Sequence, residues 1–405
     1  MKRIVFATFV LCFLLPIGVS AQNKTLVPLK IGVLNDRSGL YADLGGEGSV
    51  VAARMAVEDF NAAEKGLNVD IISADHQNRP DVGSGIARQW YDRDGVDLII
   101  DVPTSSVALA VSQITREKNK VFINSAGGSS DLTGIACTPN TIHWTYDTWA
   151  LANGTAGALS KRGGNTWFFI SADYAFGHAL ERDAANVVVK AGGKVVGQVR
   201  HPLSTSDFSS YLLQAQGSGA KVIGLANAGA DTVNAIKQAA EFGINQGGQK
   251  LAGLLIFIND IHALGLRVAQ GLVLSESFYW DHNDETRAFS KRFASRFNGK
   301  MPTMAQAGVY AGVLHYLKAI ERTRHPKDGA MVVAQMKDMP TDDKLFGIGK
   351  IRIDGRKIHP MYLFEVKSPQ ESNGEWDLYK HIATIPAEEA FRPLNEGGCP
   401  LVPRN

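Results

Sequence analysis

The chain has 405 residues, of which 45% are hydrophobic and 20% are charged, as in a globular protein large enough for two domains. The formal net charge is only +2, so the basic surface of a nucleic-acid-binding protein is not expected.

The N-terminus has the pattern of a secretory signal peptide. Lys2 and Arg3 precede an apolar run over 4–19, and small residues at 19–21 offer a cleavage site. The run is short for a membrane span, although an uncleaved anchor is the alternative interpretation. We therefore predict that residues 1–21 are removed and that the mature protein is exported to the periplasm.

Strand and helix patterns alternate through the first part of the mature chain. Apolar runs of strand length alternate with stretches whose apolar residues recur at helical spacing. The predicted strands are 29–34, 69–73, 96–100 and 121–123, and the predicted helices are 48–63, 82–92 and 106–118. This order predicts a parallel sheet that is covered by helices on both faces.

The same order repeats after a helical stretch at 149–160. The predicted strands are 166–170, 194–199, 222–226 and 251–258, and the helices between them are 179–190, 207–216 and 231–242. Three further helices (284–297, 303–322 and 329–339) and antiparallel strands (349–353, 361–366 and 376–385) complete the chain. The sequence therefore predicts an α/β fold with two doubly wound lobes, on one of which the late helices pack.

Two cysteines remain once the signal peptide is removed, Cys137 and Cys399. An exported protein with an even number of cysteines favours one disulfide, because its compartment is oxidising. Such a bond would tie the C-terminal tail to the first half of the chain. Two unpaired thiols are the alternative.

Motifs of catalysis are absent from the sequence. There is no G-x-S-x-G, H-E-x-x-H, C-x-x-C or G-x-x-x-x-G-K-[ST] motif, and the ten histidines show no zinc-ligand spacing. We therefore expect no enzyme activity, metal or cofactor. A catalytic triad assembled from distant residues would leave no local motif, so an exported enzyme remains an alternative.

Loops that follow the predicted strands offer a binding site instead, because ligands of doubly wound folds bind at the carboxyl ends of the strands. In the first half, hydroxyls at 104–106 open a helix and could seat a carboxylate, although simple N-capping explains them equally well. Small residues at 126–128 let a ligand approach the backbone. In the second half, Tyr174 and Phe176 lie after a predicted strand and before a predicted helix, where packing of the hydrophobic core least requires aromatic side chains. These loops suit a small ligand with an acidic end and an apolar or aromatic body.

Longer segments resemble the periplasmic solute-binding proteins of ABC importers, in the group related to leucine/isoleucine/valine-binding proteins. The segments are "IGVLNDRSGLYADLGGEGSVVAARMAVEDFN", "VPTSSVALAVSQITREKNKVFINSAGGSSDLTG", "TIHWTYDTWALANGTAGAL", "FFISADYAFGHALERDAANVVVKAGGKVVG" and "QAGVYAGVLHYLKAI". The resemblance implies a type I periplasmic binding fold, with two lobes that close on the ligand about a three-segment hinge. The implied crossings lie near 143–147, 278–281 and 345–349. They assign 28–143 with 281–346 to the N-terminal lobe, 144–280 with 347–385 to the C-terminal lobe, and 386–405 to a tail.

The resemblance also implies which residues contact the ligand. It places the carboxylate at Ser105 and Ser106, beside the backbone of 126–128. The predicted ligand-binding residues are Tyr41, Thr104, Ser105, Ser106, Ala126, Gly127, Gly128, Tyr146, Asp147, Tyr174, Phe176, Asn227 and Phe257. Amino-acid-binding members hold an acidic residue near the position of Phe257. Either Asp147 supplies that charge here, or the ligand carries no ammonium group, as in relatives that bind aromatic carboxylates.

The sequence thus predicts an extracytoplasmic protein that captures a small carboxylate, either an amino acid or an aromatic acid. The expected partner is an ABC permease in the inner membrane, and we expect a monomer with no affinity for nucleic acid. A secreted sensor that signals through a receptor is the main alternative.

Overall fold

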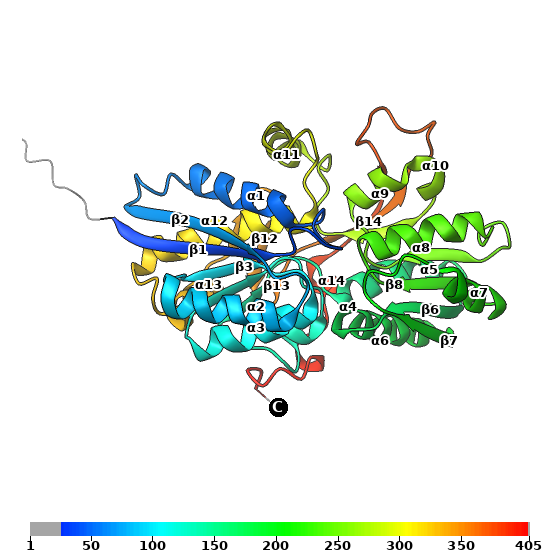
Figure 1. Ribbon diagram of the computed structural model, residues 1–405, viewed down its shortest axis with the longest axis horizontal. Coiled ribbons are helices and arrows are strands. Elements are labelled where there is room, and N and C mark those ends of the chain that lie inside the picture. Colours follow the sequence, from blue (N-terminus) through cyan, green and yellow to red (C-terminus); the bar gives the residue numbers. More distant parts are fainter. Residues whose placement is uncertain (1–25, 404–405) are drawn as a thin grey trace, which may run out of the picture.

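Residues 26–403 are described by the structure, a computed structural model, and they form two α/β lobes that lie side by side (Figure 1). The predicted signal peptide, 1–21, lies outside the described residues. Within 26–403, no helix combines the length and the apolar character needed to cross a membrane.

The first lobe contains a five-stranded parallel sheet in the order β2-β1-β3-β4-β5. Alternating residues of β1 pack on opposite faces: Leu29, Ile31 and Val33 join the cluster formed with α1 and α12, whereas Leu34 joins the cluster formed with α2 and α3. The strands are β1 (Val27–Asn35), β2 (Leu67–Asp75), β3 (Leu98–Asp101), β4 (Val121–Asn124) and β5 (Thr141–His143). The helices are α1 (Gly46–Phe60), α2 (Pro80–Gln89), α3 (Ser105–Glu117), α11 (Asp284–Arg296), α12 (Met304–Thr323) and α13 (Gly329–Asp338). The late helices pack on this lobe, since α11 and α12 contact α1, α12 contacts β3, and α13 contacts β4.

The second lobe contains a four-stranded parallel sheet in the order β7-β6-β8-β9. Trp167 and Phe169 of β6 pack with residues of α6, and Phe168 and Ile170 pack on the opposite face with residues of α7 and α8. The strands are β6 (Thr166–Ala172), β7 (Lys194–His201), β8 (Val222–Ala226) and β9 (Lys250–Gly253). The helices are α4 (Thr148–Leu151), α5 (Gly157–Lys161), α6 (Ala175–Lys190), α7 (Ser209–Gly217), α8 (Ala230–Glu241), α9 (Ile258–Leu264) and α10 (Leu266–Ala269). The prediction of two doubly wound lobes is thus confirmed.

An antiparallel sheet in the order β10-β14-β15 adjoins the second lobe. Its strands are β10 (Val273–Glu276), β14 (Met361–Val366) and β15 (Tyr379–Ile385), so the chain has returned from the first lobe before β14 begins. A short helix, α14 (Ala387–Ala390), follows and lies between the two lobes (Figure 1).

The third crossing differs from the position that the resemblance implied. The strand β12 (Gly347–Ile351) pairs with β11 (Thr341–Asp343) and β13 (Lys357–Ile358). Arg356 then forms a bridge with His143 at the end of β5. These pairings hold 347–358 against the first lobe, and the chain crosses between Ile358 and Met361 rather than at 345–349.

A second difference concerns the predicted strand 251–258. The strand β9 ends at Gly253, and α9 begins at Ile258 because the side chain of Asp260 accepts a hydrogen bond from the Phe257 backbone N–H at 2.9 Å. Such a bond satisfies an N–H that a helix start leaves without a partner.

Candidate functional site

The turn between β3 and α3 lies at the carboxyl end of the first sheet and holds an unusual backbone. Asp101, Val102 and Thr104 have positive φ angles of 86°, 53° and 76°. This region is unfavourable for side chains branched at Cβ, and such strain persists only where surrounding contacts enforce it. The buried carboxylate of Asp101 accepts hydrogen bonds from Asn35 Nδ2 (2.9 Å) and Ser125 Oγ (3.1 Å), which hold the turn. The turn therefore fixes the start of α3.

The first residues of α3 face the loop that follows β4. Ser129 donates its backbone N–H to Ser105 Oγ at 3.0 Å, so the Ser105 hydroxyl remains able to donate its own proton. The Tyr146 hydroxyl donates to the Ala126 carbonyl at 2.6 Å and holds the loop from the other side. The first N–H groups of a helix have no partner within that helix. This edge of the first lobe therefore offers donors suited to a carboxylate.

Aromatic residues from the second lobe close over this edge. Tyr174 precedes α6 and Phe176 lies in its first turn, with Phe176 only 2% exposed. A Cβ at Gly128 would lie 2.7 Å from Phe176 Cε2, so glycine permits the contact between the lobes. The Tyr41 and Tyr174 hydroxyls meet across the cleft at 2.8 Å. Burial, the neighbouring Tyr174 and the charge of Asp231 together raise the pKa of Tyr41 well above its usual value, and burial also raises the pKa of Tyr174, so both hydroxyls are neutral and one donates its proton to the other.

A second contact shows that the lobes are closed. Gly229 precedes α8 with a φ of 59°, which glycine adopts without strain. A Cβ there would lie 2.6 Å from the Leu40 carbonyl oxygen of the first lobe.

The closed cleft leaves only a narrow cavity of about 10 Å³ between the lobes, about the space that one water molecule needs, so a ligand would have to hold the lobes further apart. Its lining comes from both lobes, and no residue of the lining carries a charged side chain. The lining residues are Tyr41, Leu44, Pro103, Thr104, Ser105, Ala126, Gly128, Tyr146, Tyr174, Phe176, Ala228 and Leu255. Eight of the thirteen predicted ligand-binding residues are among them. The structure thus brings these eight together, while their contact with a ligand stays a prediction.

Two of the other predicted residues lie beside the first-lobe edge of the cavity without lining it. Ser106 is half-buried at the start of α3. Gly127 is held by a hydrogen bond from its N–H to Asn124 Oδ1 at 2.8 Å.

The last three predicted residues do not line the cavity, and each contacts other residues of the protein. Asp147 is buried in an ion pair with Arg356 (3.3 Å) and accepts a hydrogen bond from the Ala150 N–H, capping α4. Asn227 contacts His201 Nε2 at 3.0 Å. Phe257 packs edge-on against Tyr146, with the ring centroids 5.8 Å apart. Asp147 already has a cationic partner, which removes the main reason for assigning it to a ligand ammonium.

Sequence reasoning missed five residues in or beside the cleft. Leu44, Pro103, Ala228 and Leu255 line the cavity, and only their positions after strands or next to predicted contacts could have indicated them. Asp231, 1% exposed, lies close enough to Tyr41 and Tyr174 to act on both hydroxyls. Burial raises its pKa to about 7. Acidic residues are common in the first turn of a helix, so the sequence pattern did not identify Asp231 as a residue of the site.

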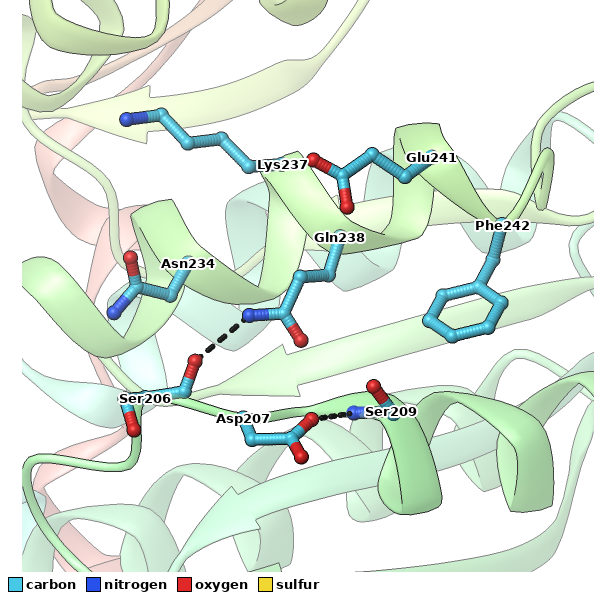
Figure 2. Close-up of a pocket in the computed structure, with 8 residues that line it drawn as sticks. All are labelled: Ser206, Asp207, Ser209, Asn234, Lys237, Gln238, Glu241 and Phe242. Carbon is cyan, nitrogen blue, oxygen red and sulfur yellow. Dashed lines mark hydrogen bonds between the residues drawn. The ribbon is translucent and has the colours of Figure 1, made fainter.

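A larger hollow of about 470 Å³ lies on the outer surface of the second lobe, between α7 and α8 (Figure 2). Its polar groups are partly paired with one another: Gln238 Nε2 donates to the Ser206 carbonyl at 2.8 Å, and the Ser209 N–H donates to Asp207 Oδ1 at 2.9 Å. All the residues that line it belong to one lobe, so closure of the lobes cannot enclose a ligand there. The cleft is the better candidate site.

Known proteins share this architecture. A family model described as "Periplasmic binding protein" matches residues 28–375. A crystal structure of a periplasmic binding protein from Burkholderia mallei is 51% identical, with a TM-score of 0.90, and the match covers 93% of this chain and 99% of that one. A branched chain amino acid ABC transporter periplasmic ligand-binding protein from Burkholderia xenovorans is 41% identical, with a TM-score of 0.82 and coverage of 92% and 99%.

A more distant relative is the Leu/Ile/Val-binding protein homolog 6 of Brucella melitensis, 25% identical over 350 residues, which are 84% of this chain and 87% of that protein. These relatives are solute-binding proteins rather than enzymes. Because the family model spans most of the sequence and the Burkholderia structures match over almost its whole length, this chain belongs to the periplasmic binding protein family.

Proposed function

We propose that this protein captures a small carboxylate between its lobes in the periplasm and delivers it, as a monomer, to an ABC permease in the inner membrane. The observation that carries the proposal is the cleft between the lobes, which residues of both lobes line and which, with only about 10 Å³ of space when closed, a ligand can enter only after the lobes open. A site of this kind suits capture and release by hinge motion.

The acidic end of the ligand binds at the start of α3. The hydroxyl of Ser105 and the first N–H groups of the helix converge with the loop that contains Gly128. The helix dipole adds partial positive charge at this end, worth about 0.3–1 kcal/mol for an anion and more where the site is partly buried. A carboxylate is thereby stabilised without a lysine or arginine.

The rest of the ligand is apolar or aromatic and carries no ammonium group. The second lobe offers the rings of Tyr174 and Phe176 and the apolar side chains of Ala228 and Leu255. No acidic residue lines the cavity: Asp147 is paired with Arg356, and Asp231 lies beside the cavity with its pKa raised to about 7 by burial. An ammonium group buried there would have no fully charged acid in direct contact and would cost several kcal/mol. We therefore favour an ammonium-free acid over the branched-chain amino acids for which the Burkholderia xenovorans relative is named.

Matched ligand pairs test this choice. L-leucine and 4-methylpentanoate differ only in the ammonium group, and benzoate and benzamide differ in the carboxylate. We expect the two carboxylates that lack an ammonium to raise the melting temperature more than their partners, with about 2.7 kcal/mol of stabilisation at 100 times the dissociation constant. Tighter binding of leucine than of 4-methylpentanoate would contradict the ammonium-free ligand, and tighter binding of benzamide than of benzoate would contradict the carboxylate seat.

The transport role needs its own measurement. Mass spectrometry of the small molecule released from the denatured protein identifies the natural ligand, and membrane vesicles then show whether its uptake depends on added protein. Binding without uptake in vesicles that contain the permease would instead favour the sensor.

A further inference from the structure

The C-terminal tail contacts both lobes although it takes no part in the cleft. The tail leaves the second lobe at the end of β15 and forms α14. Asn153 of the second lobe donates a hydrogen bond from Nδ2 to the carbonyl oxygen of Glu389 at 2.8 Å. This bond ties the tail to the second lobe at Glu389, although α14 also contacts β13 of the first lobe.

From Phe391 onward the tail is held by the first lobe. The Phe391 ring is 2% exposed and packs under the guanidinium of Arg356, with 4.4 Å from Cζ to the ring centroid. Arg352 Nη1 donates to the Arg392 carbonyl at 2.8 Å, and Arg392 Nη2 donates to the Ser130 carbonyl at 2.8 Å.

A covalent bond completes the first-lobe attachment. Cys399 forms a disulfide with Cys137, with 5.6 Å between the Cα atoms, as the cysteine count predicted. Both cysteines are buried, at 6% and 5% exposure. In Figure 1 the tail runs from the region between the lobes to the underside of the first lobe. The disulfide thus keeps the tail in place beyond its non-covalent contacts.

We propose that residues 386–399 form a fourth hinge segment and that the Cys137–Cys399 disulfide keeps this segment seated, so that it restrains the opening of the lobes. Only three peptide units join Glu389 to Arg392, and they span about 10 Å at most. The lobes cannot separate further than this at the tail unless one of its attachments breaks. Opening must therefore pivot about the edge where the tail crosses, and the proposal holds whatever the ligand is.

The tail also supports contacts between the lobes. Ser130, whose carbonyl binds Arg392, donates from Oγ to Asp183 Oδ2 of α6 at 2.7 Å. Beside it, Arg182 forms an ion pair with Asp131 at 3.1 Å. A tail that loses its attachment would release the first-lobe side of these contacts. We infer that reduction of the disulfide favours the open state and speeds ligand release.

The test compares the ligand-free oxidised protein, the same protein reduced with dithiothreitol, and a variant with Cys137→Ser and Cys399→Ser. Small-angle scattering measures the opening, and hydrogen exchange measures which segments loosen. We expect a larger radius of gyration, and exchange about tenfold faster at 387–392 and 129–134, in the reduced protein and in the variant, with β1 and β6 as protected as before. Reoxidation should restore the native curve, and the reductant should leave the variant unchanged.

Other outcomes overturn the proposal. Unchanged scattering, with faster exchange confined to residues after 393, would mean that the disulfide only holds down a free end. Faster exchange throughout β1 and β6 would mean that it acts on global stability alone. If the variant fails to fold, a titration of the native protein with reductant decides: expansion must precede any loss of helical circular dichroism, and a coincident loss refutes the hinge role.

Discussion

One added methyl group at Gly128 should keep the lobes from closing on the ligand. The Cβ of Gly128→Ala would lie 2.7 Å from Phe176 Cε2 and 3.2 Å from Tyr146 Cε2. Carbon atoms pack best at about 3.5–4.0 Å, and overpacking of this kind costs about 1–3 kcal/mol. Because Phe176 belongs to the opposite lobe, most of the cost falls on the closed state. The ligand dissociation constant should therefore rise about 5- to 150-fold.

Titration calorimetry with the ligand recovered from the protein measures this change, and the melting temperature of the ligand-free variant shows whether the fold is intact. The matched control is Gly85→Ala, in an exposed part of α2 where a new Cβ has nothing within 4 Å. This control should keep native affinity and gain up to about 1 kcal/mol of stability from helix propensity. In a double-mutant cycle of Gly128→Ala and Phe176→Ala, the loss of affinity in the double variant should be smaller than the sum of the two single losses, because the added methyl group meets no clash once the Phe176 ring is gone. Native affinity in Gly128→Ala itself would refute the closed geometry.

Three further predictions concern the cleft and its surroundings. Replacing Tyr174 and Phe176 together by Ala should weaken binding at least about tenfold in calorimetry, because burying one aromatic side chain is worth about 1–3 kcal/mol; unchanged affinity would show that they pack only within their own lobe. The Ser105→Ala variant should lose more affinity for a carboxylate than for its amide, since it removes a donor to the anion, and equal losses would count against the carboxylate seat. Burial raises the pKa of Asp231 to about 7. Between about pH 4 and pH 7 the carboxyl group is therefore protonated in the folded protein and ionised in the unfolded chain, so the free energy of unfolding falls as the pH rises through this range. The free energy of unfolding of Asp231→Asn minus that of the native protein, from urea denaturation, should therefore increase over this range, and a flat difference would contradict the shift.

Local sequence patterns were sufficient to predict the alternation of strands and helices in both sheets. Apolar runs such as 166–170 bury both faces of a strand, and the following helix shows its own periodicity. The third crossing depends instead on a distant pairing, that of Arg356 with His143. The pattern of 347–351 is equally compatible with a strand of either lobe, so the sequence alone could not assign it.

The site likewise combines features that local sequence patterns predict with features that depend on contacts between distant residues. Position after a strand correctly indicated that Ser105, Gly128 and Phe176 would meet at one cavity, because the carboxyl ends of parallel strands share one edge. Asp147 is the opposite case. It follows the last strand of the first sheet, but Arg356, 209 residues later in the chain, lies close enough to pair with it. A charge partner that remote leaves no trace in the local sequence.

The two lobes contribute different kinds of chemistry to the cavity, and this difference has consequences for specificity. The first lobe supplies hydroxyl and backbone donors on a strained turn that Asp101 holds through two hydrogen bonds, so its geometry is fixed before a ligand arrives. The second lobe supplies mainly apolar surface from Phe176, Ala228 and Leu255, which selects by shape rather than by direction. A substitution at Leu255 should therefore change which ligand body is accepted while the proposed preference for a carboxylate persists. Changes in the hydrogen bonds of Asp101 should weaken the binding of all carboxylates alike, because they disturb the seat that we propose for the carboxylate group.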